Sequence, residues 1–90
     1  MYVQVSRETF IEIQPVTPDR RPGISHIGIE VPDMDAALAR LKSRGVITQP
    51  PRKGGSNIIA SSIFDPGNVR LELVELPPDS VTRKAMGSWR

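Results

Sequence analysis

Three side chains in this sequence are suited to metal or proton chemistry, and each lies on the polar face of a predicted strand. They are Glu12, His26 and Glu72, and His26 is the only histidine among the 90 residues. A neutral imidazole nitrogen and carboxylate oxygens, at about 2.0–2.2 Å, are ligands that suit zinc and its divalent neighbours. The three residues are far apart in the sequence, and no compact motif joins them. The alternative interpretation is that all three are exposed polar residues on a solvated sheet face.

The segment around the histidine predicts a short strand followed by a helix. Aliphatic and polar or small side chains alternate there, with Ile27, Ile29 and Val31 on one face and His26, Gly28 and Glu30 on the other. Asp33 is the expected N-cap of a helix that ends at Arg44, with Gly45 as its stop. We expect this helix to pack on the aliphatic face of the strand. Ser25 adjoins His26, and strand geometry predicts opposite faces for the two side chains, which argues against a serine nucleophile with a histidine base.

The remaining segments complete one domain of the α+β class. Residues 1–14 predict a hairpin with strands at Tyr2–Val5 and Thr9–Gln14, residues 15–23 a proline-rich linker, and residues 24–76 a βαβββ module. Within the module we expect a short strand at Val46–Thr48, a loop at 49–56 whose prolines and glycines prevent regular pairing, and strands at 57–64 and 69–75 around a turn. Residues 77–90 form a tail or short helix, with Val81, Ala85 and Trp89 on its docking side.

Composition narrows the class of protein. No run approaches the roughly 20 apolar residues of a membrane-spanning helix, and the N-terminus has no export signal, so the expected location is the cytoplasm, without membrane binding. Cysteine is absent, which excludes disulfides and thiolate sites. The twelve basic residues are scattered among ten acidic ones, and the few aromatics are dispersed, so nucleic acid is not an expected partner. A chain this short has a modest core, which favours pairing with a second copy.

Several stretches together resemble one protein family. "SHIGIEVPDMDAALARLKSRGV", then "PPRKGG", then "IFDPGNVRLELVEL" look like the βαβββ module of the vicinal oxygen chelate superfamily, which includes glyoxalase I, bleomycin resistance proteins and extradiol dioxygenases. The likeness covers residues 24–76. The N-terminal "TFIEIQP" looks like the closing strand of a preceding module, most of which is absent from this sequence.

The resemblance implies a metal site. It assigns His26 as the first-strand ligand, Glu72 as the last-strand ligand, and Glu12 as ligand or general base; Glu12 and Glu72 are the candidate catalytic residues. The ion would be zinc, nickel, iron or manganese. Because one module leaves its sheet half open, we expect a homodimer. His26 and Glu72 from each chain would then converge as two His and two Glu, or the set would include Glu12 from a swapped hairpin.

Three functional hypotheses follow. The first is a metal-dependent lyase, isomerase or dioxygenase that acts on a small substrate with adjacent oxygens. The second is a metal-free protein of the bleomycin-resistance type that binds a small molecule in the dimer groove. The third is a truncated homologue that keeps the fold and the dimer without activity.

Overall fold

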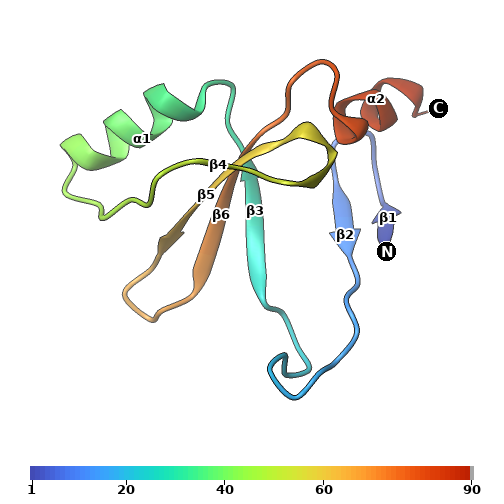
Figure 1. The fold of residues 1–90 in the computed structure, drawn as a ribbon, viewed down its shortest axis with the longest axis horizontal. Helices are drawn as coiled ribbons and strands as arrows, with labels where there is room; N and C mark the ends of the chain where they lie inside the picture. Colours follow the sequence, from blue (N-terminus) through green and yellow to red (C-terminus); the bar gives the residue numbers. More distant parts are fainter. Residues whose placement is uncertain (90) are drawn as a thin grey trace.

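The chain folds into a mixed α+β structure with two separate β-sheets (Figure 1). Segments in which polar and apolar residues alternate form strands, and an amphipathic segment forms a helix. This computed structural model describes residues 1–89, except for the side chain of Ser56. The strands are β1 (Tyr2–Gln4), β2 (Phe10–Glu12), β3 (His26–Glu30), β4 (Arg52–Lys53), β5 (Ile59–Phe64) and β6 (Arg70–Glu75). The helices are α1 (Met34–Ser43), the single 3-10 turn Gly55–Asn57 and α2 (Val81–Ser88). The predicted fold class is confirmed.

The larger sheet has the strand order β3-β6-β5-β4, in which β3 is an edge strand. β3 and β6 run parallel, which requires a crossover connection, and α1 lies in that connection. β5 pairs antiparallel with both β6 and β4, so the unit from β3 to β6 is a βαβββ module. β1 and β2 form a separate antiparallel hairpin in which Tyr2 lies opposite Glu12.

Capping interactions define both ends of helix α1. The Asp33 side chain accepts a hydrogen bond from the Ala36 backbone N–H at 3.0 Å, and the Glu75 carboxylate accepts one from the Met34 N–H at 2.7 Å. Both bonds satisfy N-terminal donors that have no partner within the helix. At the other end Gly45 adopts a φ of 82°, a left-handed conformation that favours glycine. The predicted helix is therefore confirmed at both ends.

The core is small and lies under α1. Met34, Leu38 and Leu73 are buried there, with Val31, Leu41 and Ile59 packed around them. The expected packing of α1 on the face of Ile27, Ile29 and Val31 occurs only at Val31. The helix starts directly after β3, so it covers the sheet near Val31 and contacts β5 and β6. Ile27 and Ile29, which precede Val31 in the sequence and lie within β3, are 53% and 46% exposed.

The predicted strand at Val46–Thr48 is also wrong. That segment has no regular structure, and Ile47 is 89% exposed. Arg52 and Lys53 form β4 instead, inside the loop that was expected to remain unpaired, and they pair with Ala60 and Ile59. The physical reason is that Pro50 and Pro51 lack an N–H, whereas the two residues after them have free donors and acceptors that can complete the ladder.

The C-terminal segment forms the expected helix with a different buried face. Ser80 is the N-cap of α2, its hydroxyl accepting from the Arg83 N–H at 3.1 Å. Met86 is buried and Ala85 partly buried, whereas Val81 is 64% and Trp89 37% exposed, so the predicted docking side is confirmed only at Ala85. Trp89 lies past the last helical residue and therefore does not continue the helical face. None of the helices in the described residues is long and apolar enough to cross a membrane.

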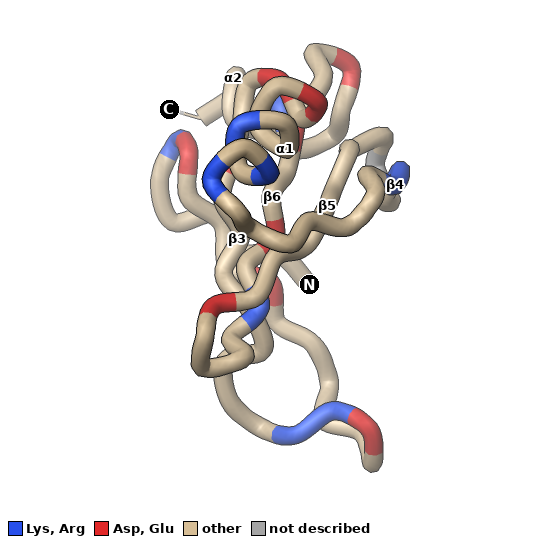
Figure 2. The backbone as a smooth tube through the Cα atoms, turned by 90° about the vertical axis from the view of Figure 1, so that its left-hand side faces the viewer, with Lys and Arg blue, Asp and Glu red and all other residues tan. Residues whose placement is uncertain are grey.

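Basic and acidic positions are spread over the molecule. In Figure 2 they occur on α1, at β4, and in the long connection between β2 and β3, where basic and acidic positions are adjacent. This connection contains a tight turn in which Thr17 and Arg20 exchange two backbone hydrogen bonds, at 3.2 and 3.0 Å.

Candidate functional site

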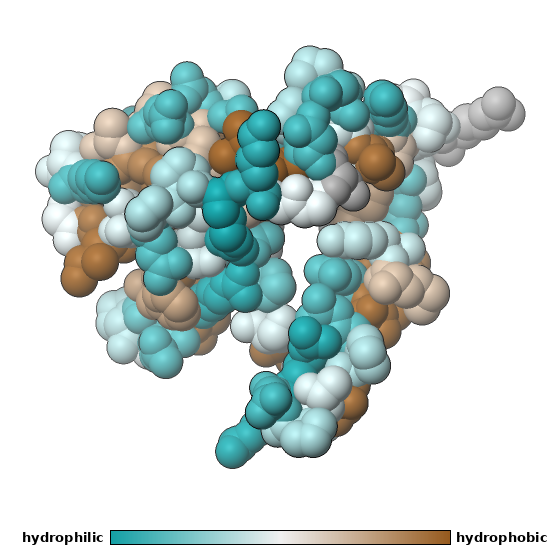
Figure 3. All heavy atoms as spheres, viewed as in Figure 1, coloured by the Kyte–Doolittle hydropathy of each residue, from teal (hydrophilic) through white to brown (hydrophobic). Residues whose placement is uncertain are grey.

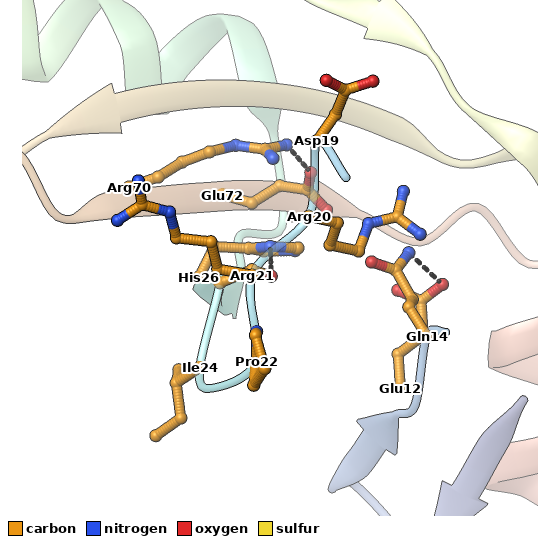
Figure 4. A pocket seen from close by; sticks show the side chains of 11 residues that line it. Glu12, Gln14, Asp19, Arg20, Arg21, Pro22, Ile24, His26, Arg70 and Glu72 are labelled. Atoms are coloured by element: carbon orange, nitrogen blue, oxygen red, sulfur yellow. Dashed lines mark hydrogen bonds and ion pairs between the residues drawn. The ribbon is translucent and has the colours of Figure 1, made fainter. Parts of the chain in front are cut away.

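A polar hollow separates the hairpin from the edge of the module (Figures 3 and 4). Its volume is about 520 Å³, and side chains from β2, the connection after it, β3 and β6 line it. The lining residues are Glu12, Gln14, Asp19, Arg20, Arg21, Pro22, Ile24, Ser25, His26, Arg70 and Glu72. In Figure 4, His26 lies on the β3 side, across from Glu12 and Gln14 on the hairpin side.

All three residues singled out from the sequence line this hollow. Glu12 ends β2, and His26 begins β3. In the parallel register His26 lies beside Arg70, and Gly28 beside Glu72. Because side chains alternate between faces, His26 and Glu72 project on the same side of the sheet. The two strands therefore bring them to one surface, and the hairpin adds Glu12 from the opposite side.

Glu72 is held by two arginines. Its Oε2 atom accepts from Arg52 Nη2 at 3.1 Å and from Arg70 Nη2 at 2.6 Å, and its side chain is only 17% exposed. Arg70 also donates through Nε to the Ser62 hydroxyl at 3.1 Å. Neither arginine was expected from the sequence to pair with Glu72. Arg70 was detectable because it shares a strand face with Glu72, whereas Arg52 reaches the carboxylate only through the unforeseen pairing of β4 with β5.

Glu12 has different surroundings, made of neutral donors. The Gln14 amide donates to its Oε1 atom at 3.0 Å, and Tyr2 faces it in the hairpin register. Burial raises the pKa of the Tyr2 phenol above its ordinary value. The charge of Glu12, a hydrogen bond to that carboxylate and the charge of Glu72 raise the pKa of Tyr2 further. Tyr2 is thus a further side chain beside Glu12, and it was not singled out from the sequence although its position opposite Glu12 follows from the hairpin pairing.

His26 contacts its sequence neighbour. The Ser25 hydroxyl oxygen lies 2.8 Å from His26 Nδ1, and both residues line the hollow. The expectation that the two side chains point to opposite faces is therefore wrong. β3 begins at His26, so Ser25 precedes the strand and is not bound by its alternation.

The donor types suit a divalent ion, but one chain does not assemble a complete set. Within residues 1–89, no three side chains of His, Asp or Glu lie close enough together to hold one metal ion. The Oε2 atom of Glu72 is also already bonded to two guanidinium groups. The residues of a single chain therefore do not fit a metal site by themselves.

The family assignment follows from a sequence match over most of this architecture. Residues 6–73 match the family model of the Glyoxalase/Bleomycin resistance protein/Dioxygenase superfamily. The chain belongs to this superfamily. The match includes β2 with Glu12, β3 with His26 and the part of β6 that carries Glu72.

Solved structures of superfamily members show the same fold. A glyoxalase family protein from Enterococcus faecalis is 27% identical with a TM-score of 0.60, over 72% of this chain and 52% of its own. A member from Sphaerobacter thermophilus DSM 20745 is 31% identical with a TM-score of 0.52, over 66% of this chain and 50% of its own. The chain thus spans about half the length of these relatives. No curated protein matches it in sequence.

Proposed function

We propose that this superfamily member is a glyoxalase-like, metal-dependent enzyme, a lyase, isomerase or dioxygenase, whose site is completed by a second chain. Its substrate is a small molecule with two adjacent oxygens. The observation that supports this proposal is the position of Glu12, His26 and Glu72 around one polar hollow in a superfamily member. Because one chain supplies too few ligands for an ion, His26 and Glu72 from two chains would provide two imidazoles and two carboxylates.

The two carboxylates have different roles in this proposal. Glu72, beside His26 on the sheet and paired with Arg52 and Arg70, is assigned as a residue that would hold the ion. Glu12 is assigned as the general base because its partners, Gln14 and Tyr2, are neutral donors that orient the carboxylate. A divalent ion, zinc, nickel, iron or manganese, supplies Lewis-acid polarisation of the substrate oxygens when bound.

Elemental analysis of the purified protein, combined with its mass in solution, tests this proposal. The wild type is expected to be a dimer that retains a divalent metal in fixed stoichiometry, and His26→Ala and Glu72→Gln are expected to lose it. Glu8→Gln serves as the matched control because Glu8 is exposed and does not line the hollow. A His26→Ala variant that still copurifies with stoichiometric metal would falsify the ligand assignment.

A second candidate function rests on the state of Glu72. Its two ion pairs, and the lack of a three-ligand cluster among the described residues, favour a metal-free protein that binds a small molecule. In that case the wild type is a metal-free dimer, and metal-supplemented growth leaves it metal-free.

A further inference from the structure

The guanidinium group of Arg70 is held in place on the β6 wall of the hollow. Its Nε atom donates to the Ser62 hydroxyl at 3.1 Å, and its Nη2 atom donates to Glu72 Oε2 at 2.6 Å. Ser62 is buried in the sheet, so it anchors one end of the guanidinium group. The Nη1 atom has no hydrogen-bond partner among the described residues, and the Arg70 side chain is 35% exposed. Arg70 lines the hollow (Figure 4), so it brings an oriented cationic group with unused donors to this space.

The charges around Arg70 do not balance. The single carboxylate of Glu72 bonds to both Arg52 and Arg70, which leaves one positive charge uncompensated. The Glu72 side chain is only 17% exposed, so solvent and salt screen this group of charges less than they screen a fully exposed pair. A ligand with one negative charge beside Arg70 would restore the balance. A dianion is disfavoured, because the same hollow is also lined by the acidic side chains of Glu12 and Asp19.

We propose that the hollow binds a small organic monocarboxylate, whose carboxylate group accepts hydrogen bonds from the guanidinium group of Arg70. The planar donor pattern of arginine matches a carboxylate in geometry and charge. Gln14 and His26 offer polar groups to the rest of the ligand, and Pro22 and Ile24 offer apolar surface. The volume of about 520 Å³ is in the usual range of small-molecule sites. The inference rests on the proposed function in placing the ligand in the same hollow, and it assigns no role to an ion.

Titration of the full chain with pyruvate after EDTA treatment, followed by ¹H–¹⁵N NMR, tests the proposal. Pyruvate is a monocarboxylate with a neighbouring ketone oxygen, and pyruvamide is its neutral counterpart of nearly the same shape. Pyruvate is expected to shift the backbone amide signals of His26 and Arg70. Pyruvamide is expected to bind about tenfold more weakly, because it lacks the charge that strengthens the hydrogen bond to Arg70. Inorganic phosphate is expected to bind more weakly than pyruvate, and tighter binding of phosphate overturns the monocarboxylate assignment.

Replacement of the arginine tests which residue holds the carboxylate. Arg70→Gln is expected to weaken pyruvate binding about tenfold. Arg40→Gln is the matched control, because Arg40 is an exposed arginine of α1 that does not line the hollow, and it is expected to bind pyruvate as the wild type does. Equal affinity of Arg70→Gln and the wild type overturns the proposal.

Glu72→Gln provides a test that a folding defect cannot imitate, because it predicts a gain of affinity. The variant removes the negative charge that competes with the ligand and keeps a side-chain oxygen as acceptor for the arginines. Pyruvate is expected to bind about threefold more tightly to Glu72→Gln than to the wild type. Weaker binding by this variant contradicts the charge balance on which the proposal is built.

The metal function and the carboxylate site can fail separately. If pyruvate binding depends on Arg70 and increases in Glu72→Gln while the wild type retains no metal, the metal function fails and the carboxylate site stands. If the wild type retains metal through His26 but EDTA-treated protein does not bind pyruvate, the carboxylate site fails and the metal function stands.

Discussion

At the level of single residues, the two carboxylates of the hollow are in unequal electrostatic environments. Glu72 contacts two cationic side chains, which together outweigh its charge. Glu12 contacts an amide and a phenol, which orient the carboxylate without neutralising it. An incoming cation therefore meets a free negative charge at Glu12 and a compensated one at Glu72. This difference is the reason for assigning proton transfer to Glu12.

The phenol of Tyr2 gives a direct measure of this environment. Tyr2 is the only tyrosine in the chain, so tyrosinate absorbance reports its ionisation alone. Its titration midpoint is expected above the ordinary 10.0. Glu12→Gln is expected to lower the midpoint part of the way, because burial is the largest cause of the shift and persists in the variant. Glu72→Gln is expected to lower it less.

The raised pKa of Tyr2 also makes the free energy of unfolding depend on pH. A raised pKa means that the folded chain retains the phenol proton after the unfolded chain has lost it. Between the two pKa values the free energy of unfolding therefore falls as pH rises, and the Tyr2 contribution is fully present only below the unfolded value. Tyr2→Phe is expected to lack this part of the alkaline loss. A wild-type midpoint at or below 10.0 contradicts the placement of Tyr2 beside the carboxylates.

At the level of elements, local patterns predicted the segments whose structure depends on near neighbours. The caps at Asp33 and Gly45 fixed α1, and alternation placed His26 and Glu72 on polar faces that parallel pairing then joined. Contacts between distant segments were not predictable in this way. Arg52 reaches Glu72 only because β4 pairs with β5, and Tyr2 affects the hollow only because the hairpin faces it. The position of α1 on the sheet is likewise set by three-dimensional packing.

The N-cap of α1 provides the stability prediction for this scale. Asp33→Ala removes the acceptor for the Ala36 N–H and is expected to lower the free energy of unfolding by about 1 kcal/mol. Urea denaturation at fixed protein concentration measures the effect. The midpoint urea concentration is expected to fall, with an unchanged m value. Asp35→Ala, in the same first turn but without the capping bond, is the control and is expected to cost less. If the free energy of unfolding falls equally in both variants, the helix dipole, rather than the cap, provides the stabilisation.

At the level of the whole molecule, the chain exposes more surface than a folded monomer of its mass. Its accessible area is 6869 Å², whereas a 9.9 kDa protein typically exposes about 5,200 Å². Its radius of gyration is 14.1 Å, against about 12 Å expected for this length. The excess of about 1,700 Å² is roughly twice the 800 Å² that each partner buries in a standard interface. The exposed area is therefore sufficient for a large contact with a second chain.

The exposed edge of β3 is where this second chain is expected to bind. β3 pairs only with β6, so its outer backbone groups have no strand partner among residues 1–89, and Ile27 and Ile29 project beside that edge half exposed. Unpaired edges with aliphatic side chains favour association. Either pairing of the two β3 strands or exchange of the hairpins would cover them.

Sedimentation at micromolar concentration is expected to give twice the 9.9 kDa chain mass. Lysines at both Ile27 and Ile29 are expected to raise the dimer dissociation constant at least tenfold, because pairing would then bury four unpaired charges. Ile47→Lys is the matched control, since Ile47 is an exposed isoleucine outside the strands, and it is expected to remain dimeric. A wild type that stays monomeric at 100 µM, roughly a hundredfold above typical micromolar affinities, would show that the open edge is not a self-association surface. If the double variant dimerises with the same dissociation constant as Ile47→Lys, the dimer interface lies elsewhere. The proposal that His26 residues from two chains share one site would then have no structural support.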